Sequence, residues 1–398
     1  MSHAAKLSGV SDDSSVFIPF AKPDIGPEEI AEVVACLQSG WIATGPRVQA
    51  FEEKLRTYLR APYAHVVNSA TSGLHIALKA VGVGVGDEVI TTPMTFVATL
   101  NTIVHSGATP VLVDIDPQTF NMDMRLLEKA LTPRTKAIMP VHFAGLPVDC
   151  APLYAFAKEK GLRVIEDAAH AVGAEYDQKR IGEFGDIQVF SFHPCKNMTT
   201  AEGGCVVTRD PEIAKKVAHL RFYGIDRDAW NRYSKEGSHT IDVVVAGFKA
   251  NMSDLQAAVG LHQIDKLDRF TAYRHGLVAR YNEAFRGWDE LILPTAPSYP
   301  HLHAWHIYTP LLNLEKTFLT RDAFVAKMKE KNVGLGVHYS PAHLFSFYRE
   351  TYGFKEGDFP HAEKVGATIM SLPLYTSLTH AQQDRVIRDM RTIFDEAR

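Results

Sequence analysis

The segment from Asp186 to Val207 constrains the fold of this chain more than any other. It reads as a strand, then a polar turn that carries Lys196, then a Glu-Gly-Gly turn at 202–204 that leads into a second strand. Pro194 cannot donate to a sheet ladder, so Lys196 is expected just past a strand end, where α/β sheets bind their ligands. The alternative is a solvated surface lysine, the usual state of this residue type.

The chemistry that a lysine offers at such a place is nucleophilic. A desolvated amine loses its proton near neutral pH and attacks a carbonyl to form a Schiff base. Pyridoxal 5′-phosphate (PLP) is the aldehyde that such lysines most often serve. We therefore interpret Lys196 as a candidate PLP-binding, catalytic lysine.

An acid is expected beside this lysine, at the end of the apolar run LRVIEDAAH at 162–170. Runs of this kind are often buried parallel strands, and the residue at the tip points into the crevice above the sheet. PLP needs a carboxylate there, because an anion beside the ring nitrogen keeps that nitrogen protonated. Asp167 is the candidate, and Glu166 is expected to turn the other way. A helix N-cap acid before Ala168 is the alternative.

A phosphate seat is predicted where a β-rich run ending at Asn68 passes into small, hydroxyl-bearing residues and then into a helical pattern. The free N–H groups and the dipole of a helix start attract an anion, and Thr71 and Ser72 add hydroxyl donors. An ordinary Ser/Thr N-cap explains the same letters. Phe96 follows the predicted strand at 87–91, so its ring is expected at the same edge, either stacked on a flat cofactor or in the core.

Together these motifs resemble a known family. Asp167 is followed 29 positions later by Lys196, which lies in the pattern S-F-H-x-x-K-x-x-x-x-x-E-G-G. A further pattern, S-G-W-x-x-T-G-P-x-V-x-x-F-E, precedes both residues at 39–52. From about Ile18 to the C-terminus, the combination resembles the DegT/DnrJ/StrS group of PLP-dependent nucleotide-sugar aminotransferases. Within that group the chain resembles the ArnB branch in four segments, which are Thr92–Phe96, Lys196–Gly204, His303–His306 and Gly336–Tyr339.

The resemblance implies an aspartate-aminotransferase-like PLP enzyme of fold type I, with glutamate as amino donor and 2-oxoglutarate as product. In the ArnB branch the acceptor is a UDP-linked 4-keto-pentose, which becomes UDP-4-amino-4-deoxy-L-arabinose for lipid A modification. The resemblance also implies that Asn251 reaches the cofactor phosphate of a neighbouring subunit, in a homodimer with shared active sites. By sequence alone, Asn251 is an ordinary N-terminal residue of a long helix. Two positions depart from the pattern: Phe96 replaces Trp, and S-A-T-S at 69–72 replaces N-G-T.

Lys196 is therefore the candidate catalytic residue. The candidate substrate-binding residues are Thr44 and His338. The candidate cofactor-binding residues are Thr71, Ser72, Phe96, Asp167, His170, Ser191 and Asn251.

Several alternatives share parts of this set. Aldol-type cleavage, or amination of another nucleotide-linked 3-keto or 4-keto hexose, would use the same lysine. Sugar dehydratases that resemble the family carry His at the lysine position, so Lys196 argues against them. A non-catalytic PLP-binding protein is favoured only if Asp167 and Lys196 do not meet in space.

Composition excludes other classes of function. The 398 residues are 46% hydrophobic and 22% charged, enough for two domains with sizeable cores. A net charge of −4 gives no basic surface for nucleic acid. The four cysteines form no CxxC pair and no apolar run approaches the roughly 20 residues that span a bilayer, so we expect a cytoplasmic protein without membrane insertion. No metal site is predicted, because His301, His303 and His306 have no acid or cysteine at a familiar zinc spacing.

The order of elements predicts an α/β fold. Strand-like runs alternate with helical patterns from about residue 24 to residue 269, which predicts a mostly parallel sheet with helices on both faces. A long helical pattern at Met252–Phe285 is expected to lead into a smaller α+β domain with strands at Trp305–Leu312 and Leu335–Tyr339. We predict a flexible N-terminal arm at 1–17, a large PLP-binding domain at 18–269 and a small C-terminal domain at 270–398.

Overall fold

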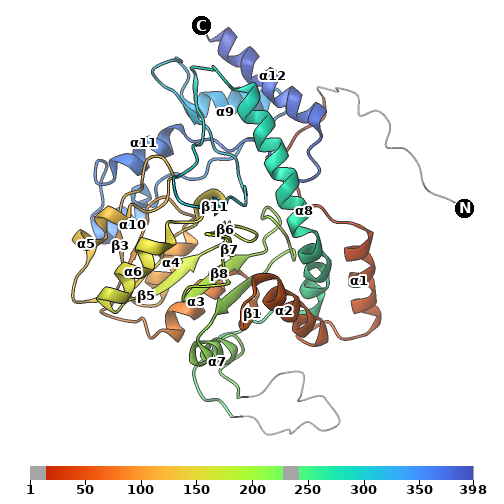
Figure 1. Cartoon of the computed structure of the whole chain (residues 1–398), viewed down its shortest axis with the longest axis vertical. Coiled ribbons are helices and arrows are strands. Elements are labelled where there is room, and N and C mark those ends of the chain that lie inside the picture. The colour runs from red at the N-terminus through yellow and green to blue at the C-terminus, as the bar shows by residue number, and fades with distance from the viewer. Residues whose placement is uncertain (1–14, 227–241, 398) are drawn as a thin grey trace, which may run out of the picture.

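A seven-stranded sheet forms the centre of the structure, a computed structural model that describes residues 15–226 and 242–397 (Figure 1). Its strand order is β1-β9-β8-β5-β4-β2-β3. Strand β9 runs antiparallel to both of its neighbours, and the other six strands are parallel to one another. The strands are β1 (Tyr63–Val67), β2 (Glu88–Thr91), β3 (Thr109–Leu112), β4 (Thr135–Ile138), β5 (Arg163–Asp167), β8 (Ile187–Ser191) and β9 (Gly204–Thr208).

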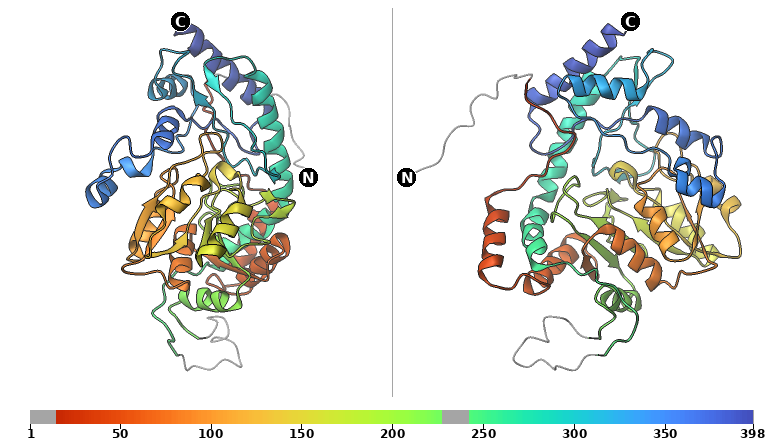
Figure 2. Two further views of the ribbon diagram at one scale, coloured as in Figure 1. Left: turned by 60° about the vertical axis from the view of Figure 1, so that its left-hand side comes forward. Right: turned by 180° about the vertical axis from the view of Figure 1, so that it is seen from behind.

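Helices cover both faces of this sheet (Figure 2), as predicted. Alternate strand residues enter opposite cores: Phe190 belongs to one and Val189 to the other. Helices shield both faces of the sheet from solvent, so β8 and β9 are buried along their whole length. The helices on the first face are α2 (Pro46–Leu59), α5 (Leu127–Ala130), α6 (Cys150–Lys160) and the first half of α8 (Asp254–Ala284). Those on the second are α3 (Ala70–Ala80), α4 (Ala98–His105) and α7 (Pro211–Leu220).

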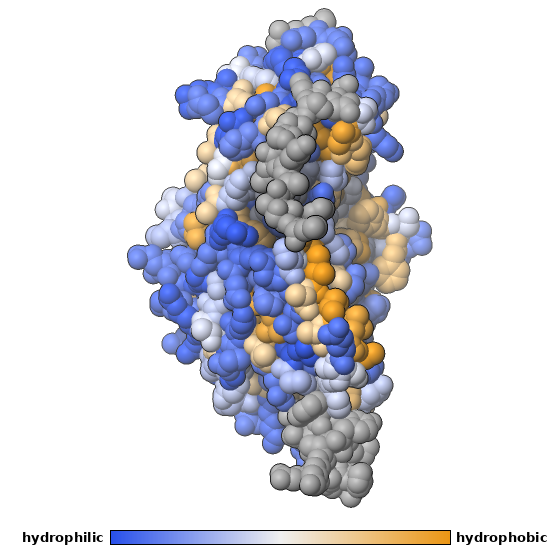
Figure 3. Space-filling model, turned by 90° about the vertical axis from the view of Figure 1, so that its right-hand side faces the viewer, coloured by the Kyte–Doolittle hydropathy of each residue, from blue (hydrophilic) through white to orange (hydrophobic). Residues whose placement is uncertain are grey.

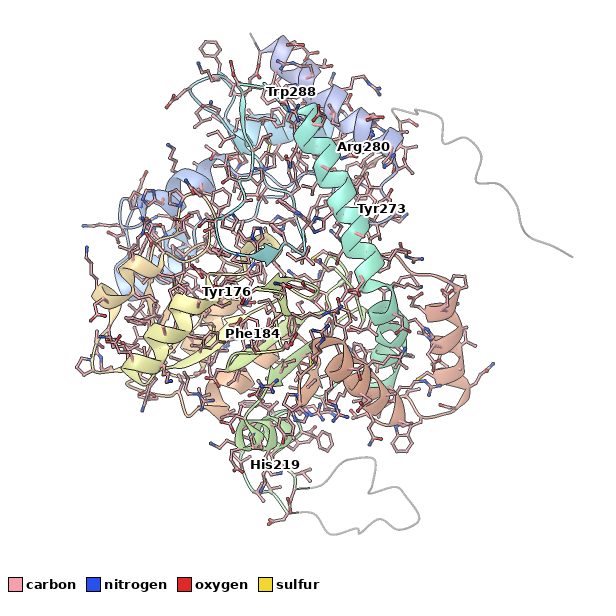
Figure 4. All side chains as sticks on the ribbon, in the orientation of Figure 1. Tyr176, Phe184, His219, Tyr273, Arg280 and Trp288 are labelled. Carbon is pink, nitrogen blue, oxygen red and sulfur yellow. The ribbon has the colours of Figure 1, made fainter. Side chains whose placement is uncertain are left out.

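Helix α8 continues from the sheet layer into a second hydrophobic core (Figure 4). Its first half buries Leu267 against the sheet, and its second half buries Tyr281 in the second core. The helix starts two residues later than predicted, because Ser253 is its N-cap in a capping box with Gln256. The predicted domain boundary at 269–270 falls inside α8 and stays a prediction, since one helix belongs to both cores.

The second core gathers short elements from the C-terminal part of the chain. Three polar or aromatic side chains that Figure 4 labels, Tyr273, Arg280 and Trp288, lie along this half of α8 or just beyond it. The elements of this core are β10 (Leu291–Ile292), β12 (Leu311–Leu312), α9 (Arg321–Glu330) and α12 (His380–Glu396). Three further elements, η4 (Ala342–Leu344), α10 (Ser346–Tyr352) and α11 (Pro360–Thr368), pack in two smaller, separate cores. A separate three-stranded sheet joins β11 (His301–Leu302), β6 (Glu175–Tyr176) and β7 (Lys179–Arg180), and η1 (Met124–Leu126) and η2 (Phe143–Gly145) are short 3₁₀ turns.

The predicted strands at Trp305–Leu312 and Leu335–Tyr339 are wrong. Within the described residues, the first forms only the two-residue pairing of β12 with β10 and isolated bridges, and Gly336 in the second forms one isolated bridge. Trp305 has a positive φ of 45°, which no strand residue adopts. The buried guanidinium of Arg274 donates to the carbonyl oxygens of Trp305 and of the next residue, which removes them from any ladder.

The face that carries α1 (Pro27–Gln38) exposes apolar side chains (Figure 3). Ile30, Val34 and Leu37 follow one another at helical spacing and are 58%, 45% and 54% exposed. Most of the predicted arm at 1–17 lies outside the described residues, and Ile18 just after it is buried beside Val333. Among the helices of residues 15–226 and 242–397, none has the length and apolar character needed to cross a membrane.

Candidate active site

A cavity of about 400 Å³ lies at the carboxyl ends of the parallel strands. Strand β5 ends at Asp167 and β8 ends at Ser191, so both side chains reach this edge of the sheet. The start of α3 and the segment 337–339 complete the walls. Seven residues predicted from the sequence line it, namely Thr71, Phe96, Asp167, His170, Ser191, Lys196 and His338.

Lys196 lies in the polar turn between β8 and β9, as predicted. Its backbone N–H donates to the His193 carbonyl at 2.9 Å, and the next residue, Asn197, donates to the Ala304 carbonyl at 2.8 Å. The turn is therefore held from both sides. Burial lowers the pKa of the Lys196 amine, while the charge of Asp167 acts in the opposite direction. The amine is thus poised to lose its proton inside the cavity.

Asp167 is buried and its carboxylate is oriented by two donors. Thr99 Oγ1 donates to Oδ2 at 2.7 Å, and the Ala169 N–H donates to Oδ1 at 3.1 Å. Burial raises the pKa of Asp167, and these two donors and Lys196 partly offset that rise. The side chain therefore faces the cavity that Lys196 lines, as predicted.

Glu166 points to the opposite face of the sheet, also as predicted. Its Oε2 atom accepts a hydrogen bond from His142 at 2.7 Å, and its Oε1 atom accepts from Tyr154 and Gln188. Both oxygens are occupied in the core, so Glu166 has no part in the cavity.

The first turn of α3 lies at the wall of the cavity, where the sequence predicts an anion seat. Ser69 is the N-cap and accepts a hydrogen bond from the Ser72 N–H at 3.1 Å. Ser72 also bonds to the Ser69 hydroxyl and does not line the cavity, so it serves the cap, whereas Thr71 lines the wall. Gly204 lets the sheet approach this turn, because a Cβ at that position would lie 2.6 Å from the Ala70 nitrogen.

Aromatic and imidazole rings close the other side. Phe96 is 58% exposed, and its ring centroid lies 6.2 Å from that of Tyr339. His170 Nε2 lies 3.0 Å from the Tyr339 hydroxyl, and His338 Nδ1 lies 2.7 Å from Ser371 Oγ. Burial lowers the pKa of His338 to about 4 and that of His170 well below its ordinary value. Both imidazoles are therefore neutral near pH 7.

Thr44 and Asn251 lie in a second pocket, of about 520 Å³, that is lined by other residues. Asn251 Nδ2 donates to Thr44 Oγ1, and Lys249 Nζ donates to Asn251 Oδ1 at 2.7 Å. Asn251 precedes α8 and forms a bridge with Val67, so it is not a residue of that helix. Within one chain, these two predicted residues do not line the cavity of Lys196.

Sequence reasoning missed the residues that reach the cavity over long separations. Tyr339 and Thr99 contact His170 and Asp167 from 169 and 68 residues away. The sequence of the segment Gly336–Tyr339 indicated the family resemblance, but it did not predict the contact between Tyr339 and His170. Among the described residues, no group of three metal-binding side chains gathers, and His303 stacks on Trp305 with 3.7 Å between ring centroids.

The residues that line the cavity fit PLP. An amine with a lowered pKa and a buried carboxylate suit the aldehyde and the ring nitrogen, and the start of α3 suits the phosphate. The buried Nδ1 atom of His170 has no hydrogen-bond partner in the described part of the chain, so a bound molecule with an acceptor would satisfy it. When bound, PLP supplies the carbonyl that takes up an amino group and the ring that withdraws electrons.

A mostly parallel sheet with a lysine and an acid at adjoining strand ends defines a PLP-dependent enzyme of the aspartate-aminotransferase-like fold type I. The profile of the DegT/DnrJ/EryC1/StrS aminotransferase family matches residues 23–391, and the chain belongs to this family. It is 46% identical over 378 residues to the spore coat polysaccharide biosynthesis protein SpsC of Bacillus subtilis, covering 95% of this chain and 97% of the relative.

Solved structures agree with this assignment. A putative sugar aminotransferase from Streptococcus pneumoniae in its PMP form is 33% identical with a TM-score of 0.89, covering 96% of this chain and 100% of that one. Helicobacter pylori PseC, an aminotransferase involved in the biosynthesis of pseudaminic acid, is 28% identical with a TM-score of 0.88 and the same coverage. The Streptococcus protein is also known in a PLP form. The protein is therefore a PLP-dependent aminotransferase.

Proposed function

We propose that the protein transfers an amino group from glutamate to a nucleotide-linked 4-keto sugar, with release of 2-oxoglutarate. The observation that carries this proposal is the meeting of Lys196 and Asp167 in one cavity at the strand ends. The likeness to sugar aminotransferases over the whole family region supports a sugar as the acceptor.

The most specific form of the proposal is a UDP-linked 4-keto-pentose that becomes UDP-4-amino-4-deoxy-L-arabinose. It rests on the resemblance to the ArnB branch in four segments, three of which, 92–96, 196–204 and 336–339, include residues that line the cavity. Relatives named for spore coat polysaccharide and for pseudaminic acid favour a wider choice of acceptor. Another nucleotide-linked 3-keto or 4-keto hexose is therefore the second candidate substrate.

Three side chains share the chemical work in this proposal. Lys196 Nζ would accept the proton that the α-carbon of the amino donor loses and later return it, a role that its lowered pKa permits. Asp167 holds a proton on the ring nitrogen. His338 binds the sugar as a neutral imidazole, and Ser371 on its Nδ1 leaves Nε2 for the substrate.

A homodimer with shared sites is part of the proposal. Thr44 and Asn251 line a separate pocket of their own chain, so they are available to complete the cavity of a partner. The exposed stripe of α1, at Ile30, Val34 and Leu37, lies next in the chain to the loop that carries Thr44, and apolar surface of this kind favours burial against protein. The four cysteines form no disulfide among the described residues, which is usual in a reducing compartment, so a cytoplasmic location stays our prediction.

The test is a panel of nucleotide-linked 4-keto and 3-keto sugars with glutamate as donor, read by release of 2-oxoglutarate. We expect turnover with at least one 4-keto sugar, fastest with the UDP-linked pentose, and none in a Lys196→Ala variant. Turnover with free keto acids but with no nucleotide-linked sugar would overturn the proposed acceptor class.

A further inference from the structure

One contact joins the sheet edge of the cavity to the segment that closes it. Tyr339 and His170 both line the cavity, and the Tyr339 hydroxyl lies 3.0 Å from His170 Nε2. Their rings are nearly parallel, with an interplanar angle of 22°. In the described part of the chain, this is the one hydrogen bond recorded for the Tyr339 hydroxyl. The contact therefore fixes the ring of His170 from across the cavity.

The direction of this hydrogen bond follows from the chemistry of the two groups. Burial raises the pKa of Tyr339 far above its ordinary value, so the phenol keeps its proton. Burial lowers the pKa of His170, so its ring is neutral and holds one N–H and one lone pair. An imidazole nitrogen is a better acceptor than a phenol oxygen, and a phenol is a good donor. The hydroxyl therefore donates to Nε2, and the ring proton stays on Nδ1.

That proton has no acceptor among the described residues. His170 Nδ1 is buried and makes no hydrogen bond, and the residue as a whole is only 5% exposed, so bulk water does not supply the missing partner either. The nearest ring, that of His306, has its centroid 4.3 Å away, and its own Nδ1 is also without a partner. A buried donor of this kind is rarely left unsatisfied in a working protein. The remaining source of an acceptor is the molecule that occupies the cavity.

We propose that Tyr339 is a positioning residue that locks His170 in the tautomer with its proton on Nδ1, so that this N–H donates to an oxygen of the bound cofactor. The inference rests on the proposed cofactor-binding role of His170. It adds a residue from the C-terminal part of the chain to the cofactor site, 169 residues from its partner. Loss of the phenol leaves the ring free to move its proton to Nε2, and the cofactor then loses a donor.

The expected effect is on cofactor affinity, measured by titration of cofactor-free protein with PLP. Tyr339→Phe should raise the Kd for PLP by about three- to tenfold, the effect of one hydrogen bond. Tyr308→Phe is the matched control, because its hydroxyl donates to Asn282 at 2.6 Å in the second core and does not line the cavity. We expect that control to leave the Kd unchanged.

A double-mutant cycle separates positioning from packing. In His170→Asn the side-chain amide takes the approximate place of Nδ1 and donates without help from Tyr339. Tyr339→Phe should then have no further effect on the Kd for PLP in the His170→Asn background. An equal effect in both backgrounds would overturn the proposal, because it would show that Tyr339 acts without His170.

A direct measurement of the tautomer tests the proposal even if a variant folds poorly. Nitrogen-15 NMR of histidine-labelled protein without cofactor, with His170 assigned from the His170→Asn variant, should show a proton on Nδ1 and a bare Nε2. A proton on Nε2 in the unmodified protein would contradict the inference whatever the affinities are. If sugar turnover fails while this signature holds, the substrate proposal falls and the role of Tyr339 stands.

Discussion

Lys196 and Asp167 change each other's protonation across the cavity. Burial lowers the pKa of Lys196, and the charge of Asp167 limits that fall. Burial raises the pKa of Asp167, and Lys196 limits that rise. A protonated ring nitrogen beside Asp167 would favour the carboxylate further, because an opposite charge at short range stabilises the ionised form.

The first prediction concerns the pH dependence of cofactor capture. A lowered pKa means that the free amine of Lys196 is present at lower pH than in a surface lysine. The rate at which cofactor-free protein takes up PLP should therefore rise with pH to a midpoint below the ordinary lysine value of about 10.4. In a Lys196→Ala variant, PLP can form a Schiff base only with surface lysines, and that slower reaction should keep the ordinary midpoint. Equal midpoints in the two proteins would show that the amine is not perturbed.

The second prediction uses two adjacent acids that face opposite sides of the sheet. Asp167→Asn cannot hold the ring nitrogen protonated, so turnover should fall by about 100-fold or more, the scale of one lost electrostatic contact. Glu166→Gln is the control: it disturbs the hydrogen bonds to His142, Tyr154 and Gln188 in the core. We expect it to lower the melting temperature and keep turnover per folded molecule. Near-normal transamination by Asp167→Asn would reduce Asp167 to a structural acid.

At the scale of elements, the predicted anion seat depends on one close approach between β9 and α3. A Cβ at Gly204 would lie 2.6 Å from the Ala70 nitrogen and 2.7 Å from the Phe190 carbonyl oxygen, and neither backbone atom can move freely. Gly204→Ala should therefore cost about 1–3 kcal/mol of stability and weaken PLP binding. Gly84→Ala is the control, because no atom lies within 4 Å of its added Cβ. Chemical unfolding and PLP titration of both variants measure the difference, and equal behaviour would contradict the role of Gly204.

Most elements were predictable because their signals are local. The strand that ends at Asp167 and the helix α8 show hydrophobic patterns and caps within their own segments. The strand predicted at 305–312 was wrong because the β-rich sequence of this segment does not reveal that Arg274 donates hydrogen bonds to two of its carbonyl oxygens. Such a contact is non-local and outweighs strand propensity.

The same limit applies to the site across the whole molecule. Lys196 and Asp167 could be found because each follows a strand-like run, and parallel strands bring their carboxyl ends to one edge. Tyr339 carried no comparable signal, because its partner His170 lies 169 residues earlier and the segment around Tyr339 forms no regular strand. Thr44 and Asn251 were named only through a family resemblance, and one chain places them in a pocket of their own.

The last prediction concerns assembly and follows from this separate pocket. If Asn251 completes the cavity of a partner, then a Lys196→Ala chain and an Asn251→Ala chain complement each other. In a mixed dimer, one site combines both lesions and the other has an intact lysine and an intact asparagine. Random mixing should restore about a quarter of the wild-type sites, since half of the dimers are mixed and each has one complete site.

The measurement is turnover after the two variants are unfolded and refolded together, compared with each refolded alone. PLP is kept at a level that leaves Asn251→Ala unsaturated, because cofactor that touches both subunits also stabilises their association. Gly84→Ala mixed with Lys196→Ala is the control for mixing, and its activity should match the share of Gly84→Ala chains. Complementation should disappear when the dimers are diluted until they dissociate. No recovery in the mixed sample, or sedimentation of a fully active, PLP-saturated monomer, would show that each chain completes its own site.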